Sequence, residues 1–375
     1  MPYSHMRIAR LRRKLVTERL DALYIRNLSN IRWLTAFEGV FDEESAHGVL
    51  VTPENVFLHT DARYALAMKE AAQGSGIAVD DAEATHAEWL ASIFQVKDGL
   101  LPETIGIEDD ITLAEYRRIE AALETAMKAR GFEVRIEGTN NLVLKLRATK
   151  DADEVRRIRA AQAITDKAFA HIIGFIRPGM SERAVQIELE GFMVRQGANS
   201  LAFPSIVAAG ANGASPHAIP GETKLVAGAA VVLDFGACAF GYCSDMTRTI
   251  FLGEPDTRMR QAYDAVRQAN EEVEAFLKPG VTGAQAQKHA EDILVAAGFG
   301  GAMGHSLGHG VGLDVHEEPI LATRNKAPLE EGNVVTVEPG VYFKHEFGIR
   351  IEDFGIVTHD GFEVFTESSH DMVII

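Results

Sequence analysis

Four carboxylates lie on apolar, strand-like segments in the second half of the chain. Asp234 lies near the end of the run AVVLDF, and Asp245 follows after ten intervening residues, in SDMTRTIFL. Glu338 lies in VVTVEPG, and Glu352 follows after thirteen intervening residues, in GIRIED. An unpaired carboxylate in an apolar setting is costly, so these acids must be protonated or must meet cations. Lysines are scarce here, and two divalent metal ions would neutralise such a cluster better.

The period-two alternation of a strand assigns a neighbour to several of these groups. Because residues two apart point to the same face, Thr247 is expected to support Asp245. Three pairs share a strand face on this basis: Asp245 with Thr247, Thr336 with Glu338, and Arg350 with Glu352.

Histidines in glycine-rich segments accompany both acid pairs. The segment GGAMGHSLGHGVGLDVHEEP contains His305, His309 and His316, and PSIVAAGANGASPHAIPG contains His217. The glycines allow the backbone to approach closely, and one imidazole added to four carboxylates gives an oxygen-rich site with a single nitrogen ligand. This mixture suits Mn(II), Co(II) or Zn(II) better than it suits a structural zinc ion, which prefers thiolate and imidazole.

A weak internal repeat supplies the elements that must position these residues. The 24 residues from Phe175 align without gaps with those from Phe276, an offset of 101 residues, and seven positions are identical. Each copy is typical of a helix end, a Pro-Gly turn, an N-cap at Ser181 or Thr282, and a second amphipathic helix. A chance likeness between two helix pairs joined by a Pro-Gly turn is the alternative. Each copy is followed by a histidine-bearing glycine-rich stretch and by strands that carry acids, which favours a duplication.

The first part of the chain has a different pattern. Strand-like runs such as LDALYI, HGVLVT, NVFLH and TIGIED alternate with helical ones such as ARYALAMKEAAQ and ITLAEYRRIEAALETAMKAR. This alternation predicts an α/β domain. Asp151 and Glu154 then form a capping box that opens a helix through about Phe175. We therefore expect domains at residues 1–148 and 149–375.

Composition excludes several classes of partner. The chain has 37 Lys+Arg against 54 Asp+Glu, a net charge of −17, and its summed field repels nucleic acid and anionic lipid. No segment approaches the roughly 20 apolar residues of a membrane span, and no uninterrupted apolar run follows the basic start. The two cysteines, Cys238 and Cys243, match no disulfide framework and are expected to be small apolar strand residues. The expected location is the cytoplasm.

Together these residues resemble a known family. HSLGHGVGLDVHE, Asp234 in VLDFG, Asp245 in SDMTRT, Glu338 in VEPG and Glu352 in RIED resemble the pita-bread metallopeptidases of the aminopeptidase P and prolidase branch. SNIRWLTAF and TDARY resemble the creatinase-type amino-terminal domain of that branch. The resemblance implies an α+β chain, with a creatinase-like α/β domain followed by a duplicated, pseudo-twofold pita-bread catalytic domain.

The resemblance also implies roles for single residues. It assigns the metal ligands, of which Asp245 and Glu352 would bridge two ions: Asp234, Asp245, His309, Glu338 and Glu352. It implies that Glu338 is the general acid/base and that a metal-bridging water is the nucleophile. His217 and His316 would contact the substrate or oxyanion, His305 would line the site, and Arg350 would orient a ligand carboxylate or meet the substrate's carboxylate. The implied activity is cleavage of Xaa-Pro bonds in small proline peptides, by a homodimer with two divalent ions, Mn(II) first.

Other functions stay open on the sequence alone. The enzyme could be an Xaa-Pro dipeptidase or an Xaa-Pro aminopeptidase, or could be a hydrolase or lyase of a small non-peptide substrate. GHSLG matches the GxSxG elbow of serine hydrolases, although an apolar strand before it and a helix after it are missing. A non-enzymatic binding module is disfavoured by the complete ligand set. Arg248 is expected to hold the fold, and His370 to be structural.

Overall fold

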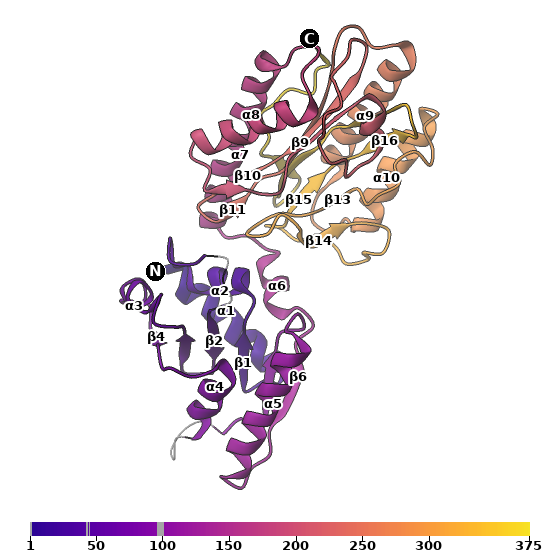
Figure 1. The fold of residues 1–375 in the computed structure, drawn as a ribbon. Coiled ribbons are helices and arrows are strands. Elements are labelled where there is room, and N and C mark those ends of the chain that lie inside the picture. Colours follow the sequence, from indigo (N-terminus) through magenta and orange to yellow (C-terminus); the bar gives the residue numbers. More distant parts are fainter. Residues whose placement is uncertain (1, 43, 45, 96–100) are drawn as a thin grey trace. The chain divides into compact units, whose positions relative to one another are not determined.

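The computed structural model describes residues 2–42, 44, 46–95 and 101–375. The chain divides into two units, Met1–Arg147 and Ala148–Ile375, each with its own sheets and helices (Figure 1). Among the described residues, no helix has the length and hydrophobicity needed to cross a membrane.

The first unit is built on one six-stranded sheet with the order β4-β3-β2-β1-β5-β6. Its strands are β1 (Ala22–Ile25), β2 (Gly48–Val51), β3 (Val56–His59), β4 (Ile77–Asp80), β5 (Thr104–Ile107) and β6 (Arg135–Gly138). Its helices are α1 (Pro2–Glu18), α2 (Leu28–Thr35), α3 (Ala65–Ala71), α4 (His86–Gln95), α5 (Leu113–Lys128) and α6 (Leu142–Arg147). All strands run in one direction except β2, which is antiparallel to both of its neighbours. This confirms the predicted α/β class of the first half.

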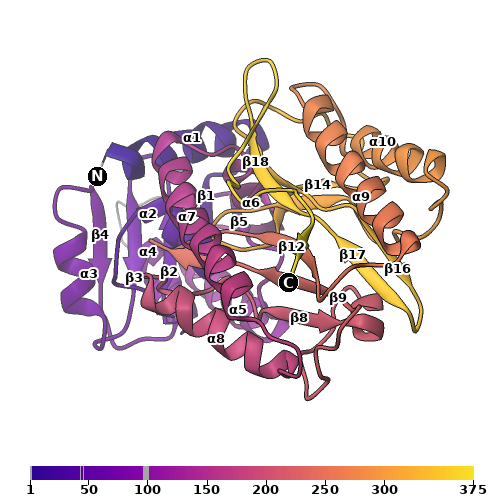
Figure 2. The ribbon, with the colours of Figure 1, turned by 90° about the horizontal axis from the view of Figure 1, so that it is seen from above.

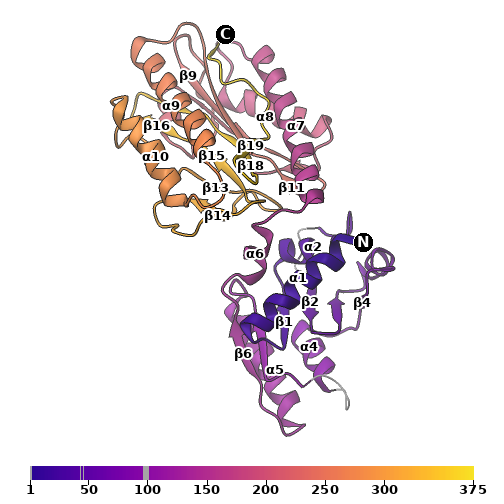
Figure 3. The same cartoon turned by 180° about the vertical axis from the view of Figure 1, so that it is seen from behind.

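The second unit consists of two helix pairs outside several small sheets. The helices are α7 (Ala152–Phe175), α8 (Glu182–Arg195), α9 (Thr257–Phe276) and α10 (Gly283–Ala296). Pairs α7/α8 and α9/α10 lie on opposite sides of the strands (Figures 2 and 3). The strands are β7 (Ser200–Leu201), β8 (Ile206–Ala209), β9 (Ala230–Phe235), β10 (Ala237–Ala239), β11 (Tyr242–Cys243), β12 (Met246–Phe251), β13 (Gly308–Gly310), β14 (Glu317–Leu321), β15 (Val334–Val337), β16 (Gly340–Phe343), β17 (Phe347–Arg350), β18 (Asp353–Val357), β19 (Phe362–Val364) and β20 (Val373–Ile374).

The structure bears out the internal repeat. Helices α7 and α9 both end at the aligned phenylalanines, and α8 and α10 both have 14 residues with a side-chain cap from Ser181 or Thr282. The glycines of the two Pro-Gly turns, Gly179 and Gly280, have φ values of 89° and 93°. Each half then forms an antiparallel triplet, β8-β9-β12 in the first and β13-β15-β18 in the second. The capping box of Asp151 and Glu154 that opens α7 is also present.

The prediction of two unpaired cysteines was wrong. Cys238 and Cys243 form a disulfide between β10 and β11, where they are direct cross-strand partners. The strands are joined by a two-residue turn at Phe240 and Gly241, both with positive φ, which is the geometry of a tight hairpin. The spacing of the two cysteines matches no common disulfide framework, so it gave no sign of the bond. The tight turn sets the strand register that places Cys238 opposite Cys243.

Candidate metal centre

Each half of the second unit delivers two carboxylates to the centre. Asp234 lies on β9, and Asp245 immediately precedes β12, which is antiparallel to β9. Glu338 immediately follows β15, and Glu352 lies between β17 and β18. The strands β9, β12 and β15 are fully buried, so the acids at or next to their ends emerge from an apolar framework.

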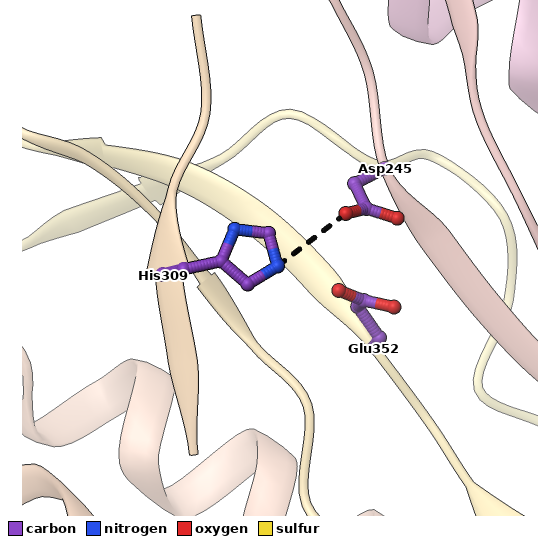
Figure 4. Close-up of side chains that lie close together, drawn as sticks. All are labelled: Asp245, His309 and Glu352. Atoms are coloured by element: carbon purple, nitrogen blue, oxygen red, sulfur yellow. Dashed lines mark ion pairs between the residues drawn. The ribbon is translucent and has the colours of Figure 1, made fainter. Parts of the chain in front are cut away.

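His309 on β13 faces these carboxylates. Ligand atoms of Asp245, His309 and Glu352 all lie within 4.8 Å of one another (Figure 4). The Nε2 atom of His309 is 3.6 Å from Asp245 Oδ2 and 3.3 Å from Glu338 Oε1. The backbone before His309 can lie this close to Thr336 because Gly308 has no side chain, and a Cβ atom at Gly308 would collide with the Thr336 backbone. The structure therefore brings an imidazole and three carboxylates together.

A local hydrogen bond sets the tautomer of His309. Its Nδ1–H donates to the carbonyl oxygen of Gly310 at 3.0 Å. A carbonyl can only accept, so a neutral ring has its lone pair on Nε2, the atom that faces the acids. Burial lowers the pKa of His309, which favours this neutral form. A lone pair turned toward carboxylates is the arrangement that a cationic ligand would stabilise.

The carboxylates disfavour one another's charge. Burial raises the pKa of Asp245 well above its usual range, and nearby Asp234 and Glu338 add to the shift. Burial likewise raises the pKa of Glu352, with further contributions from Asp245 and Glu338. Burial raises the pKa of Glu338 to about 6. The cluster therefore needs protons or other cations.

Asp234 has a cationic partner of its own. Arg350 Nη2 lies 2.5 Å from Asp234 Oδ2, and both side chains are largely buried. The Nε and Nη1 groups of Arg350 donate to Thr247 Oγ1 at 3.0 Å and to Tyr342 OH at 2.8 Å. Of the two expectations for Arg350, orientation of a ligand carboxylate is the one that this geometry supports.

Tyr342 is a centre residue that the sequence analysis missed. Its hydroxyl lies 2.9 Å from His305 Nε2, while His305 Nδ1 donates to the Ser306 carbonyl at 2.8 Å. A continuous hydrogen-bonded chain thus runs from His305 through Tyr342 and Arg350 to Asp234. Strand alternation could not have pointed to it, because Glu338 follows β15 whereas Tyr342 lies on the next strand, β16.

Of the three neighbour assignments, the one for Thr247 was wrong and the one for Thr336 was right. Arg350, the third, donates its side-chain hydrogen bonds to residues other than Glu352. Thr247 Oγ1 donates to Glu352 Oε2 at 2.6 Å and is therefore a partner of Glu352, because Glu352 pairs with Thr247 in an isolated β-bridge. Alternation along one strand could not show this partner from another strand. Thr336 Oγ1 donates to Glu338 Oε1 at 3.2 Å, as the alternation predicted.

The other two predicted histidines are exposed. The ring of His316 packs edge-on against that of His309, with centroids 4.3 Å apart. Partial desolvation of the His316 ring lowers its pKa, and the neighbouring rings of His309 and His217 lower it further. His217, in the loop after the short helix Gly210–Ala214, also contributes to the lowered pKa of His305, for which burial is the main cause. Both His217 and His316 are accessible to a ligand.

The serine-hydrolase alternative does not fit the backbone. Gly304-His305-Ser306-Leu307-Gly308 precedes strand β13, whereas a nucleophile elbow follows a strand and opens a helix. Residues 101–375 are all described, and within them no helix follows α10. Ser306 therefore has no elbow geometry.

The donor set fits divalent cations. Among the described residues, nothing donates a hydrogen bond to the buried atoms Asp234 Oδ1 and Asp245 Oδ1. Buried carboxylate oxygens without partners are costly, and they lie in the same cluster as the free lone pair of His309. Four carboxylates with one imidazole form an oxygen-rich set that suits metals of the Mn(II) type.

Comparisons with known proteins agree with this geometry. Residues 156–359 match the model of metallopeptidase family M24, and residues 7–148 match that of the creatinase/prolidase N-terminal domain. An uncharacterized peptidase of Bacillus subtilis strain 168 is 35% identical over 99% of this chain and 100% of its own length.

Two solved structures are also similar. A structure described as an Xaa-Pro dipeptidase from Bacillus anthracis has a TM-score of 0.90 and 37% identity, covering 99% of this chain and 100% of that one. A structure described as an X-Pro aminopeptidase from Thermotoga maritima MSB8 has a TM-score of 0.83 and 32% identity, covering 95% and 98%. The chain belongs to metallopeptidase family M24 and carries the creatinase/prolidase N-terminal domain.

Proposed function

We propose that the chain is an Xaa-Pro dipeptidase that uses two divalent metal ions. The observation that carries the proposal is a cluster of one imidazole with several buried carboxylates. The Nε2 lone pair of His309 faces the carboxylates, and burial raises the pKa values of Asp245 and Glu352. The ligands in this proposal are Asp234, Asp245, His309, Glu338 and Glu352. Bound there, divalent metals would activate water and polarise the scissile carbonyl.

Glu338 is the proposed general acid/base. Its pKa of about 6 leaves it largely ionised near neutral pH, so it can accept a proton from the attacking water. The same carboxyl then donates that proton to the proline nitrogen as the peptide bond breaks. Thr336 Oγ1, which donates to Glu338 Oε1, holds the carboxylate in place for both transfers.

Other side chains of the centre orient the reacting groups. Arg350 fixes Asp234 through their short ion pair, and Tyr342 holds Arg350 and His305 together. His217 and His316 are proposed to donate hydrogen bonds to the substrate, because both are exposed and electrostatically coupled to the histidines of the centre. An N–H group of either ring, placed against a developing oxyanion, would help to stabilise it.

The preference for a dipeptidase is supported by the comparisons. The structure described as an Xaa-Pro dipeptidase is more similar to this chain in both TM-score and identity than the one described as an X-Pro aminopeptidase. The proposal includes Mn(II) as the first metal to test, ahead of Co(II) and Zn(II). It also includes a homodimer, which sedimentation of the purified protein would test.

A direct assay separates the two activities. The purified chain is freed of metal with a chelator, reloaded with Mn(II), Co(II) or Zn(II), and supplied with Gly-Pro or with an Xaa-Pro-Xaa tripeptide of matched first residue. We expect metal-dependent cleavage of Gly-Pro at a higher kcat/KM than that of the tripeptide. Preferential release of the first residue from the tripeptide would assign an aminopeptidase, and cleavage of neither peptide with any metal would refute the proposal.

A further inference from the structure

Arg248 makes an unusually complete set of contacts for a residue outside the metal centre. It lies on β12 next to Thr247, and its side chain is 1% exposed. A guanidinium has five N–H donors. Its five contacts are to Ser369 O at 3.1 Å, Thr247 O at 3.0 Å, Glu352 O at 2.7 Å, Asp353 Oδ1 at 2.6 Å and Ser368 O at 2.7 Å. The number of contacts equals the number of donors.

Glu352 depends on this part of β12 for its position. Its backbone N–H donates to Thr247 O at 3.0 Å, its carbonyl accepts from Arg248 Nη1, and its carboxylate accepts from Thr247 Oγ1. It lies between β17 and β18, where an isolated bridge to Thr247 replaces a continuous ladder. Two adjacent residues of β12 thus hold the backbone and the carboxylate of Glu352.

The C-terminal segment, residues 368–375, is tied to the same strand. Strand β20 pairs in parallel with the end of β12, and Ile375 N donates to Phe251 O at 2.8 Å. The carbonyls of Ser368 and Ser369 both accept from Arg248. His370 Nε2 lies 2.5 Å from Asp353 Oδ2, next to Glu352 in the sequence. The segment therefore completes the environment of Arg248.

A second metal-binding group is the alternative for part of this region. Ligand atoms of Glu274, Asp353 and His370 lie within 4.8 Å of one another. However, Arg248 already pairs with one oxygen of Asp353 and His370 with the other, and His370 Nδ1 lies 3.2 Å from Glu271 Oε1. Since each ring nitrogen of His370 faces a carboxylate, the ring is a doubly donating cation. Two side-chain cations thus occupy the place that a metal would need.

We propose that Arg248 is a positioning residue that couples residues 368–375 to the metal ligand Glu352. The inference rests on the proposed function only in taking Glu352 as a ligand. Arg248 holds the carbonyl of Glu352, and the C-terminal carbonyls together with the Asp353–His370 pair hold Arg248. Loosening this network weakens metal binding, because a ligand that is no longer held in place must be ordered when the metal binds.

The test measures metal affinity directly. Arg248→Lys keeps the charge but offers three donors in place of five. Titration calorimetry of the metal-free full chain with Mn(II) should show affinity lower by roughly 10–100-fold, the usual effect of losing a residue that supports a ligand. Turnover lost at limiting Mn(II) should return as Mn(II) is raised, with an unchanged KM for Gly-Pro. Arg258→Lys, in an exposed pair with Glu346, is the matched control and should leave affinity unchanged.

A second variant guards against misfolding of the first. His370→Gln loses the contact with one of the two carboxylates that His370 faces, and it should also weaken Mn(II) binding. Thermal unfolding of the metal-free variants shows whether each of them is folded. Unchanged Mn(II) affinity in both folded variants would overturn the inference. So would a third bound metal per chain that His370→Gln removes. If the wild-type chain binds Mn(II) tightly but cleaves no proline peptide, the proposed function fails while the affinity test of Arg248 still stands.

Discussion

Replacing Glu338 with glutamine tests the proposed chemistry most directly. The change is nearly isosteric, and the remaining amide oxygen can still accept the hydrogen bond that Thr336 Oγ1 donates at 3.2 Å. What it removes is the ability to accept a proton and one of the four negative charges of the cluster. Because the side chain is only 16% exposed, solvent cannot easily replace its function.

The expected loss of turnover is the full contribution of a general acid/base, because Glu338 is almost entirely ionised at pH 8. With a pKa of about 6, about 99% of Glu338 is ionised at pH 8 and ready to accept a proton. A positioned general acid/base contributes roughly 10²–10⁴-fold to turnover, or about 3–5 kcal/mol of the activation free energy. We expect Glu338→Gln to lose kcat by this factor and to retain both metals at saturating Mn(II), because three carboxylates and His309 remain.

The assay combines metal analysis with kinetics. Metal content per chain is measured by mass spectrometry, and kcat and KM for Gly-Pro are measured from pH 5 to 9. In the wild type kcat should rise with pH along a limb at or below about pH 6, because bound cations lower the pKa of a carboxyl group further. The variant should lack this limb. Glu346→Gln, on the exposed turn between β16 and β17, is the control and should behave as wild type.

Two results would refute the reasoning. Full turnover in a Glu338→Gln protein that carries both metals would show that another group transfers the proton. A loss of turnover that disappears when Mn(II) is raised would show that Glu338 acts through metal affinity alone.

Three further outcomes follow from the structure. Burial raises the pKa of Asp245 and Glu352, so Mn(II) must displace protons when it binds. Calorimetry in two buffers of different ionisation enthalpy should therefore show proton release and an affinity that falls as the pH is lowered, and pH-independent affinity would contradict this. Lys150→Met leaves Glu317 buried without its 2.8 Å partner and should lower the free energy of unfolding by about 3–5 kcal/mol in urea titrations. Gly348→Ala drives a Cβ atom into the Gly213 backbone and should lower the free energy of unfolding by about 1–3 kcal/mol or more. Gly174→Ala on α7, where the added Cβ atom meets open space, should leave the free energy of unfolding unchanged or raise it by up to about 1 kcal/mol.

Local chemistry in the sequence was sufficient for most elements of the fold. The Asp151 and Glu154 capping box, the aligned Pro-Gly turns and the alternation of strand and helix each involve groups within a few residues, and each appears in the structure. Helix α1 was not anticipated, because its buried residues Ile8, Leu11 and Leu15 are embedded in a strongly basic segment. The residue types alone also indicated an oxygen-rich cluster with one imidazole.

The partners within the centre were decided by tertiary structure. Arg350 and Asp234 are 116 residues apart, and Thr247 and Glu352 are 105 apart. Strand alternation says which face a side chain occupies but not which strand lies opposite, so it gave Thr247 the wrong carboxylate and left Tyr342 unnoticed. The sequence by itself determined which groups could bind metal and where the strands that carry them lie. Pairing of distant strands decided which groups meet, because it depends on the packing of both halves of the second unit and has no local signal.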